Sequence, residues 1–263
     1  FTGQDTFTYK FNDGVLDSNI STVTITVFDA FVNTARQVGN TIKSLESDPN
    51  TNMVTTNKDG SIIAVSSEGG FVRVYKNIEG TWTQLGSVIS EEYSSSDLGD
   101  WKLSMNNDGT RISIGDHNNE FVNVYDFIDD SWVQVGNKIE SFDSGDAFGY
   151  PPSLSGDGSV LLSSGYESDI NGDNSGAVYA YKFDGVNWVQ LGQTIYGEEG
   201  DSIGYDAQIN NDGTIIAMAS YDNSYVKVFE YNSETQLWEQ LGSNIVGEIE
   251  YIDISNDGKT ILI

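Results

Sequence analysis

The stretch Trp132-Val133-Gln134-Val135-Gly136-Asn137-Lys138-Ile139 contains a motif that returns along the whole chain. The motif consists of Gln, an apolar residue, Gly, two variable residues and Ile. Its glycines are Gly39, Gly86, Gly136, Gly192 and Gly242, with spacings of 47, 50, 56 and 50 residues. Two residues before the glutamine stand Trp82, Trp132, Trp188 and Trp238, whereas the first copy has Ala35 there. A nearly fixed period of this length is typical of a repeat architecture.

A second motif keeps phase with the first. Asp-Gly pairs begin at Asp59, Asp108, Asp157, Asp212 and Asp257, and each pair is followed by a run rich in β-forming residues. An Asp-Gly pair between two such runs predicts a hairpin, because glycine accepts a positive φ without a Cβ penalty. We interpret these aspartates as turn formers, because an aspartate side chain hydrogen-bonds its own backbone in turns.

Each repeat unit is predicted to contain four short strands. In one copy they are 101–105, 111–115, 121–127 and 132–136. Four antiparallel strands in roughly 50 residues is the period of a propeller blade. The chain is therefore expected to be all-β, a β-propeller of four-stranded antiparallel blades, with about four to five blades present in an incomplete ring. The four in-phase tryptophans are interpreted as structural residues that pack between adjacent blades.

Composition excludes several classes of function. Of the 263 residues, 38% are hydrophobic and 12% aromatic, which is enough for a core. Asp and Glu number 40 against 12 Lys and Arg, a formal charge of -28, so nucleic-acid binding by a basic face is not expected. No apolar run approaches the roughly 18 residues of a membrane span, so membrane insertion is not expected. Cysteine is absent and His117 is the only histidine, which excludes disulfides, cysteine nucleophiles and multi-histidine metal sites.

The first 28 residues differ in kind from the repeats. The runs Asp5-Thr6-Phe7-Thr8-Tyr9 and Ser21–Val27 resemble the last strands of bacterial cadherin-like or Ig-like tandem repeats, and a simple hairpin is the alternative. The resemblance implies a short N-terminal β-sandwich remnant at 1–28, a linker at 29–34 and propeller repeats over 35–263, truncated at the C-terminus. Residues 35–42 match the fourth strand of a blade, so we expect them to complete the last blade of the ring.

From about residue 34 onward, the repeats resemble integrin-like FG-GAP propeller repeats of bacterial surface proteins. The resemblance is carried by Gly145-Asp146-Ala147-Phe148-Gly149, Ser155-Gly156-Asp157-Gly158, Ser175-Gly176-Ala177-Val178-Tyr179 and Trp188-Val189-Gln190-Leu191-Gly192. The family implies further blades, and calcium in the loop between the first two strands of a blade. Here that loop has shrunk to Asn107-Asp108-Gly109 and its counterparts, which lack the alternating ligands.

One longer loop is a candidate cation site. It carries oxygen ligands at alternate positions, Asp169, Asn171, Asp173 and Ser175, and such ligands suit a hard cation such as Ca²⁺. The loop is not an EF-hand, because Asn174 stands where a glycine is required. We expect weak Ca²⁺ binding here and no other cofactor; the alternative is a solvated polar loop.

Catalysis finds little support among the residues. His117 stands in the polar run 116–119 and is interpreted as a solvated loop residue. With 40 acidic residues in the chain, some pair of carboxylates is guaranteed and carries no information. Trp101 is out of phase with the other tryptophans and is the candidate for stacking on a ligand. We therefore expect a protein that is not an enzyme.

The resemblance to bacterial surface proteins implies the expected function. This is a non-catalytic binding or adhesion module of a large secreted or cell-surface protein, with an extracellular or cell-surface location and a protein or carbohydrate ligand. Two alternatives remain open. One is an accessory domain or part of a carbohydrate-active enzyme, and the other is a purely structural spacer.

Overall fold

The structure is a computed structural model that describes residues 3–9, 21–27, 37–42, 51–67, 70–90, 102–141, 144–249 and 251–263. Of residues 3–9, 21–27 and 51–52 it describes the backbone alone. The chain divides into two compact units, residues 1–38 and 39–263. In the first unit, β1 (Gly3–Tyr9) and β2 (Ser21–Val27) form an antiparallel pair. Over the described residues, no helix offers the length and apolar character that crossing a membrane requires.

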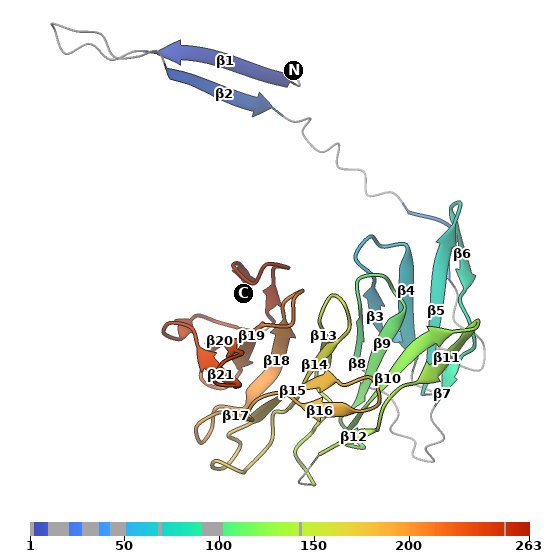
Figure 1. Ribbon diagram of the computed structural model, residues 1–263, viewed down its shortest axis with the longest axis vertical. Coiled ribbons are helices and arrows are strands. Elements are labelled where there is room, and N and C mark those ends of the chain that lie inside the picture. Colours follow the sequence, from blue (N-terminus) through green and yellow to red (C-terminus); the bar gives the residue numbers. More distant parts are fainter. Residues whose placement is uncertain are drawn as a thin grey trace, which may run out of the picture. The chain divides into compact units, whose positions relative to one another are not determined.

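In the second unit the described residues form four five-stranded antiparallel sheets and one two-stranded sheet, which we number blades I to V (Figure 1). Blade I contains β3 (Thr51–Thr56), β4 (Ile62–Ser67), β5 (Phe71–Ile78), β6 (Thr81–Gln84) and β7 (Ile89–Ser90). Blade II contains β8 (Lys102–Met105), β9 (Arg111–Asp116), β10 (Phe121–Ile128), β11 (Ser131–Gln134) and β12 (Ile139–Glu140). Blade III contains β13 (Ser153–Leu154), β14 (Val160–Gly165), β15 (Ala177–Phe183), β16 (Trp188–Gln190) and β17 (Ile195–Tyr196). Blade IV contains β18 (Ile203–Ile209), β19 (Ile215–Ser220), β20 (Tyr225–Asn232), β21 (Leu237–Gln240) and β22 (Ile245–Val246), and the described part of blade V contains β23 (Asp253–Ile254) and β24 (Ile261–Leu262).

Within each complete blade the first four strands pair in sequence order, and a fifth strand of two residues pairs with the third. In blade II, β10 pairs with β11 through Tyr125 and Gln134, and with β12 through Val122 and Ile139. Gly136 lies between these two contacts. The repeat motif therefore splits the expected fourth strand into two pieces that share one neighbour.

Side-chain caps hold the hairpin between the first two strands of a blade. In blade II, Asp108 Oδ1 accepts the N–H of Thr110 at 3.0 Å, and Asn106 Oδ1 accepts the N–H of Arg111 at 2.9 Å. Asp59, Asp157 and Asp257 make the same bond to the residue two positions on. Among the described residues, no group of three His, Cys, Asp or Glu side chains is placed to hold a metal ion.

The first strands of successive blades are neighbours around the axis, and their turn ends are joined by backbone hydrogen bonds. The residue before each turn aspartate donates its N–H to the carbonyl of its counterpart in the next blade. These bonds run from Lys58 to Asn107, from Asn107 to Gly156, from Gly156 to Asn211 and from Asn211 to Asn256, at 2.8–3.2 Å. The side chains of Asn107 and Asn211 also bond at 2.5 Å across Gly156, where a Cβ would lie 2.1 Å from the Asn211 oxygen. The propeller is thus closely packed at this end.

At the outer edge, the glycines of the first four repeat motifs pack against the tryptophan of the next blade. Trp188 donates its indole N–H to the carbonyl of Val135 at 3.2 Å and its backbone N–H to Asn137 Oδ1 at 2.8 Å. Gly136, between these acceptors, has a φ of +76°, and a Cβ there would lie 2.7 Å from Cδ1 of Trp188. Trp132 and Trp238 make the same indole bond to Leu85 and Leu191. We call this contact the glycine–tryptophan latch.

The two ends of the series differ in their latches. Residues 37–42 form no strand, yet Asn40 Oδ1 accepts the backbone N–H of Trp82 at 2.6 Å, and a Cβ on Gly39 would lie 2.8 Å from the Trp82 ring. At blade IV, by contrast, no described atom lies within 4 Å of the Cβ position of Gly242. The expected fold class is confirmed: the described residues are all-β and form four five-stranded blades and part of a fifth in an incomplete propeller.

The latch predicts a large difference between two glycine substitutions. Gly80 has a φ of +83°, close to that of Gly136, but nothing lies within 4 Å of its Cβ position. Gly136→Ala and Gly80→Ala both introduce a strained backbone, whereas only Gly136→Ala introduces a clash with Trp188. We expect Gly136→Ala to be about 1–3 kcal/mol more destabilising than Gly80→Ala, as measured by urea unfolding. Equal losses of stability in the two variants would mean that the latch is not close-packed.

Candidate functional site

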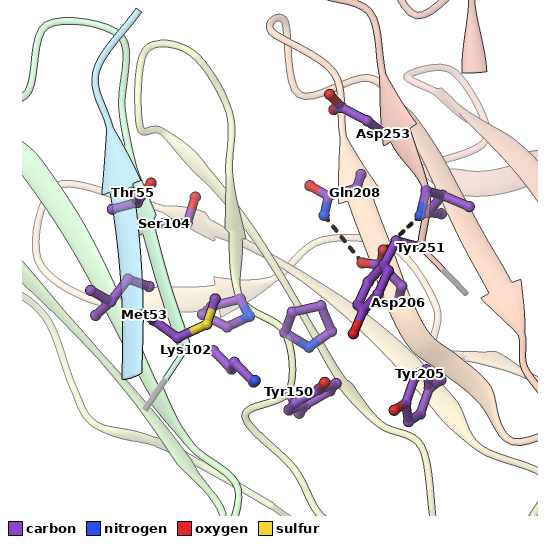
Figure 2. A pocket seen from close by; sticks show the side chains of 14 residues that line it. Met53, Thr55, Lys102, Ser104, Tyr150, Tyr205, Asp206, Gln208, Tyr251 and Asp253 are labelled. Carbon is purple, nitrogen blue, oxygen red and sulfur yellow. Dashed lines mark hydrogen bonds between the residues drawn. The ribbon is translucent and has the colours of Figure 1, made fainter. Parts of the chain in front are cut away.

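A cavity of about 640 Å³ lies along the inner strands of the propeller. Its walls are formed by residues of β3, β8, β18 and β23 and by the segment 150–152 before β13, so all five blades contribute (Figure 2). The cavity brings polar side chains from separate blades together, which makes it the candidate functional site.

Side chains reach the cavity because the inner strands alternate. On β18, Asp206 and Gln208 line the cavity, while Ala207 and Ile209 point into the core between blades. Asp206 stands six residues before the turn aspartate of its blade. The same position is occupied in the other blades by Met53, Lys102, Pro151 and Tyr251, all of which line the cavity. The same position in the five blades therefore places five different residue types in the wall of one cavity.

Asp206 is the buried carboxylate in the wall of this site, since the residue is only 7% exposed. One of its oxygens accepts the backbone N–H of Ile252 at 2.8 Å, and the other accepts the side-chain N–H of Gln208 at 3.1 Å (Figure 2). Burial raises the pKa of Asp206 above its ordinary value, and these hydrogen bonds offset only part of the increase. A carboxylate whose pKa is raised toward neutrality is suited to accept or donate a proton.

Lys102 is the only Lys or Arg among the described residues that line the cavity. Its Nζ lies 4.6 Å from the ring centroid of Tyr150, a cation–π contact, and both residues belong to the cavity wall (Figure 2). Burial raises the pKa of Tyr150, so its hydroxyl stays protonated. The cavity thus contains one ammonium group beside a tyrosine hydroxyl, and a carboxylate on another blade.

A sharp turn brings a tyrosine into the wall of the cavity. In blade IV the turn is 201–204, in which Ser202 and Gly204 have φ values of +45° and +90°. Ile203 between them is fully buried and anchors the turn, and Tyr205 follows at once and lines the cavity. Blade III repeats this turn at 146–149 and places Tyr150 in the same way.

Asp201 holds the turn in blade IV. Its carboxylate accepts the N–H of Glu198 at 2.7 Å, the side-chain N–H of Asn223 at 2.9 Å and the hydroxyl of Tyr225. Burial alone raises the pKa of Asp201, but these hydrogen bonds outweigh it and leave the pKa below the ordinary value. Asp201 is therefore a structural, ionised carboxylate with a lowered pKa, whereas burial raises the pKa of Asp206.

In the loop predicted to bind Ca²⁺, the polar groups make hydrogen bonds to the loop itself and to neighbouring residues. Asp169 Oδ1 accepts the N–H of Asn174 at 2.7 Å, and Asn171 donates its side-chain N–H to the carbonyl of Gly197 at 2.7 Å. Ser175 is buried and donates its hydroxyl to the carbonyl of Ser168 at 2.9 Å. The carbonyl of Asp173 accepts the N–H of Gly200 at 2.8 Å. Calcium binding at this loop stays a prediction.

Trp101, the predicted ligand-stacking residue, lies outside the described residues. It stands seven residues before its turn aspartate, which is also the position of Tyr150 and Tyr205 in their blades. His117 was expected to be solvated, but it is half-buried, and its ring meets Tyr150 edge-on with centroids 5.5 Å apart. Sequence reasoning missed Asp206, Lys102 and the tyrosines that line the cavity. The sequence does contain one sign of Asp206 and Lys102: the position six residues before the turn aspartate carries a different residue type in every blade.

No family model matches this sequence, and no curated protein matches it. Solved structures do match. A protein of Bacteroides fragilis NCTC 9343, provisionally named a 6-phosphogluconolactonase, is 16% identical with a TM-score of 0.55, over 74% of this chain and 55% of that one. A protein of Bacteroides uniformis ATCC 8492 with the same provisional name is 17% identical with a TM-score of 0.54, over 81% of this chain and 60% of that one. A Lactobacillus plantarum protein is 13% identical with a TM-score of 0.60, over 99% of this chain and 74% of that one.

These comparisons identify a propeller-type fold and correct the expected function. This chain spans 55% and 60% of the length of the two Bacteroides proteins. The expectation of a non-catalytic adhesion module is contradicted, because two of the similar structures carry an enzyme name and none of the three is described as an adhesion protein. The fold is one that proteins named as enzymes share.

The raised pKa of Asp206 predicts a pH-dependent stability. The folded protein holds this proton more tightly than the unfolded chain does, so the group stabilises the fold at low pH. That contribution is lost as the pH rises from the ordinary value of 3.8 through the raised pKa. Relative to Asp206→Asn, which cannot ionise, the free energy of unfolding of the wild type should therefore fall across this window.

Urea unfolding of both proteins over a series of pH values measures this difference. Asp253→Asn is the matched control, because Asp253 lines the same cavity with an exposed side chain. A difference between wild type and Asp206→Asn that stays constant with pH would contradict the assignment.

Proposed function

We propose that the axial cavity hydrolyses a neutral sugar lactone, which is a cyclic ester of a sugar acid. The observation that carries the proposal is the buried Asp206 carboxylate, which faces a cavity that also holds the Lys102 ammonium group. The provisional name of the two Bacteroides proteins supports the reaction class. The cavity volume of about 640 Å³ lies in the range typical of small-molecule sites.

Asp206 is the proposed general base. Its carboxylate takes a proton from a water molecule, and the water oxygen attacks the carbonyl carbon of the ester. Negative charge then develops on the carbonyl oxygen, and the ammonium group of Lys102 stabilises it. When the bond between the carbonyl carbon and the ring oxygen breaks, the ring oxygen receives the proton from Asp206. The product is the open-chain hydroxy acid, and Asp206 is returned to its starting state.

The charge of the site favours a substrate without phosphate. Lys102 is the only cation among the described lining residues, whereas Asp206 and Asp253 both contribute carboxyl groups. The whole chain carries a formal charge of -28. A phosphate group brings about -1.5 to -2 charges at neutral pH, which this field repels. The same field favours release of the anionic product, since the neutral lactone becomes a carboxylate on hydrolysis.

Three further assignments stay predictions. They are the FG-GAP-type character of the repeats, the cadherin-like or Ig-like character of the N-terminal hairpin, and a location outside the cell. Calcium would act at the loop 169–175, and no step of the proposed reaction depends on it.

Hydrolysis of glucono-δ-lactone tests the proposal, with hydroxylamine trapping of the remaining lactone as the assay. We expect the wild-type chain to accelerate hydrolysis above the buffer rate. Asp206→Asn should lower kcat/KM by about 10²–10⁴-fold, because general-base catalysis contributes that much. Asp253→Asn, in the same cavity, should retain most of the activity. A wild-type rate equal to that of buffer alone would refute the proposal.

The phosphorylated substrate gives a second measurement. We expect 6-phosphoglucono-δ-lactone to have a lower kcat/KM than glucono-δ-lactone, with the difference shrinking as salt screens the charge. A preference for the phosphorylated lactone would show that the charge argument is wrong, even if hydrolysis itself is observed.

A further inference from the structure

Five aromatic side chains form a connected cluster that adjoins the axial cavity, and we call this cluster the aromatic rim: His117, Tyr150, Tyr166, Tyr205 and Tyr221. Neighbouring rings in the rim have centroids 4.8–5.7 Å apart. Tyr150 meets three of the other four rings, and Tyr205 connects it to Tyr221. The rim is continuous with the cavity, because Tyr150 and Tyr205 also line it (Figure 2).

The rim is built from two equivalent positions in successive blades. His117, Tyr166 and Tyr221 are each the first residue after the second strand of a blade, which ends at Asp116, Gly165 or Ser220. Tyr150 lies three residues before the inner strand β13, and Tyr205 is the third residue of the inner strand β18. Because the first and second strands of a blade are antiparallel, the end of one and the start of the other lie at the same end of the propeller. The aromatic residues therefore gather opposite the packed turn end.

The rim is not part of the hydrophobic core. None of its five side chains is buried, and Tyr221 is 52% exposed. The core aromatics of the same blades behave differently, since Phe121 and Phe148 are at most 1% exposed. A contiguous group of tyrosines that stay partly accessible is suited to bind a ligand, because a tyrosine offers an apolar face together with a hydroxyl group.

A second, outer cavity of about 350 Å³ adjoins the rim. It is lined by His117 and Tyr166 together with Glu120 and Glu167. The Nδ1 atom of His117 is buried and has no hydrogen-bond partner among the described residues. An unpartnered buried nitrogen is costly unless a ligand or a water satisfies it. The binding surface thus extends from the axial cavity, over the rim, to a polar atom that lacks a partner.

We infer that the aromatic rim binds a neutral oligosaccharide whose terminal unit enters the axial cavity. Sugar rings present C–H faces that pack on aromatic rings, while their hydroxyl groups can bond to tyrosine hydroxyls and to His117. The carboxylates of Glu120 and Glu167 disfavour an anionic chain. This inference deepens the proposed function, because it names the part of the substrate that lies outside the cavity.

Isothermal titration calorimetry with four neutral hexasaccharides tests the inference: cellohexaose, xylohexaose, laminarihexaose and maltohexaose. We expect at least one of them to bind at least tenfold more tightly than its own monosaccharide. Hexagalacturonate, the anionic counterpart, should bind at least tenfold more weakly than the best neutral chain. The absence of binding by all four neutral chains at millimolar concentration would overturn the inference, as would equal affinity for the monosaccharide.

Substitutions within the rim locate the site. Tyr221→Ala and Tyr166→Ala should each weaken binding about tenfold, because each removes one aromatic face. Tyr196→Ala is the matched control, since Tyr196 is 38% exposed on β17 and lies outside the rim and both cavities. Equal loss in the control and the rim variants would place the sugar elsewhere and overturn the inference.

The outcome is separable from that of the proposed reaction. None of the hexasaccharides is a lactone, so binding is measured without turnover. Binding without any lactone hydrolysis would remove the proposed reaction and leave the rim. Hydrolysis of glucono-δ-lactone without hexasaccharide binding would leave the proposed reaction and overturn the inference about the rim.

Discussion

The contact between a glycine of one blade and the tryptophan of the next is the constraint on which the other features depend. Gly136 shows why only glycine serves: its φ is positive, and the indole of Trp188 occupies the space of a side chain. The indole N–H then bonds a carbonyl of the preceding blade at 3.2 Å. Near the axis, the backbone bond from Asn107 to Gly156 fixes a second point. One contact thus lies at the outer edge of the sheet and the other at the axis. Together they determine how a blade is rotated against its neighbour, and hence which side chains of the inner strands face the cavity.

Much of this fold could be predicted because its signals are local and repeated. The turn aspartates make the backbone bonds that their type and spacing imply, as Asp108 does with Thr110 at 3.0 Å. What the repeat could not predict is the split of the fourth strand, because the two pieces share β10 as a neighbour on either side of Gly136. The expected strand at 132–136 is therefore shorter, and it is followed by a second contact at Ile139.

Repetition made the fold predictable, but it could not reveal the candidate site, because the residues of the site do not repeat from blade to blade. A search for repeats retains what recurs, and position six before the turn aspartate varies from Met53 to Lys102 to Asp206. Among 40 acidic residues nothing in the sequence distinguishes Asp206, because its difference is burial, and burial depends on neighbouring blades. His117 was misjudged in a similar way: its neighbours along the chain are polar, but the ring it contacts belongs to the next blade. The adhesion hypothesis rested on a resemblance of repeats, and repeats carry information on fold more than on chemistry.

The two ends of the propeller differ in the same way: repeated residues form one end, and residues that vary between blades form the other. At the turn end, the same residue types recur in each blade, the backbones bond directly, and a Cβ on Gly156 would collide with Asn211. Variation there breaks contacts that several blades share. At the opposite end, the chain leaves and enters the sheets through loops, so a residue such as Tyr166 or Tyr221 can change without altering a strand. Loops on a rigid scaffold are where binding residues concentrate. The latch and the axial hydrogen bonds supply that scaffold. Between blades IV and V the axial bond from Asn211 to Asn256 is the one that joins neighbouring first strands, and the segment before β23 then covers Asp206 through the N–H of Ile252.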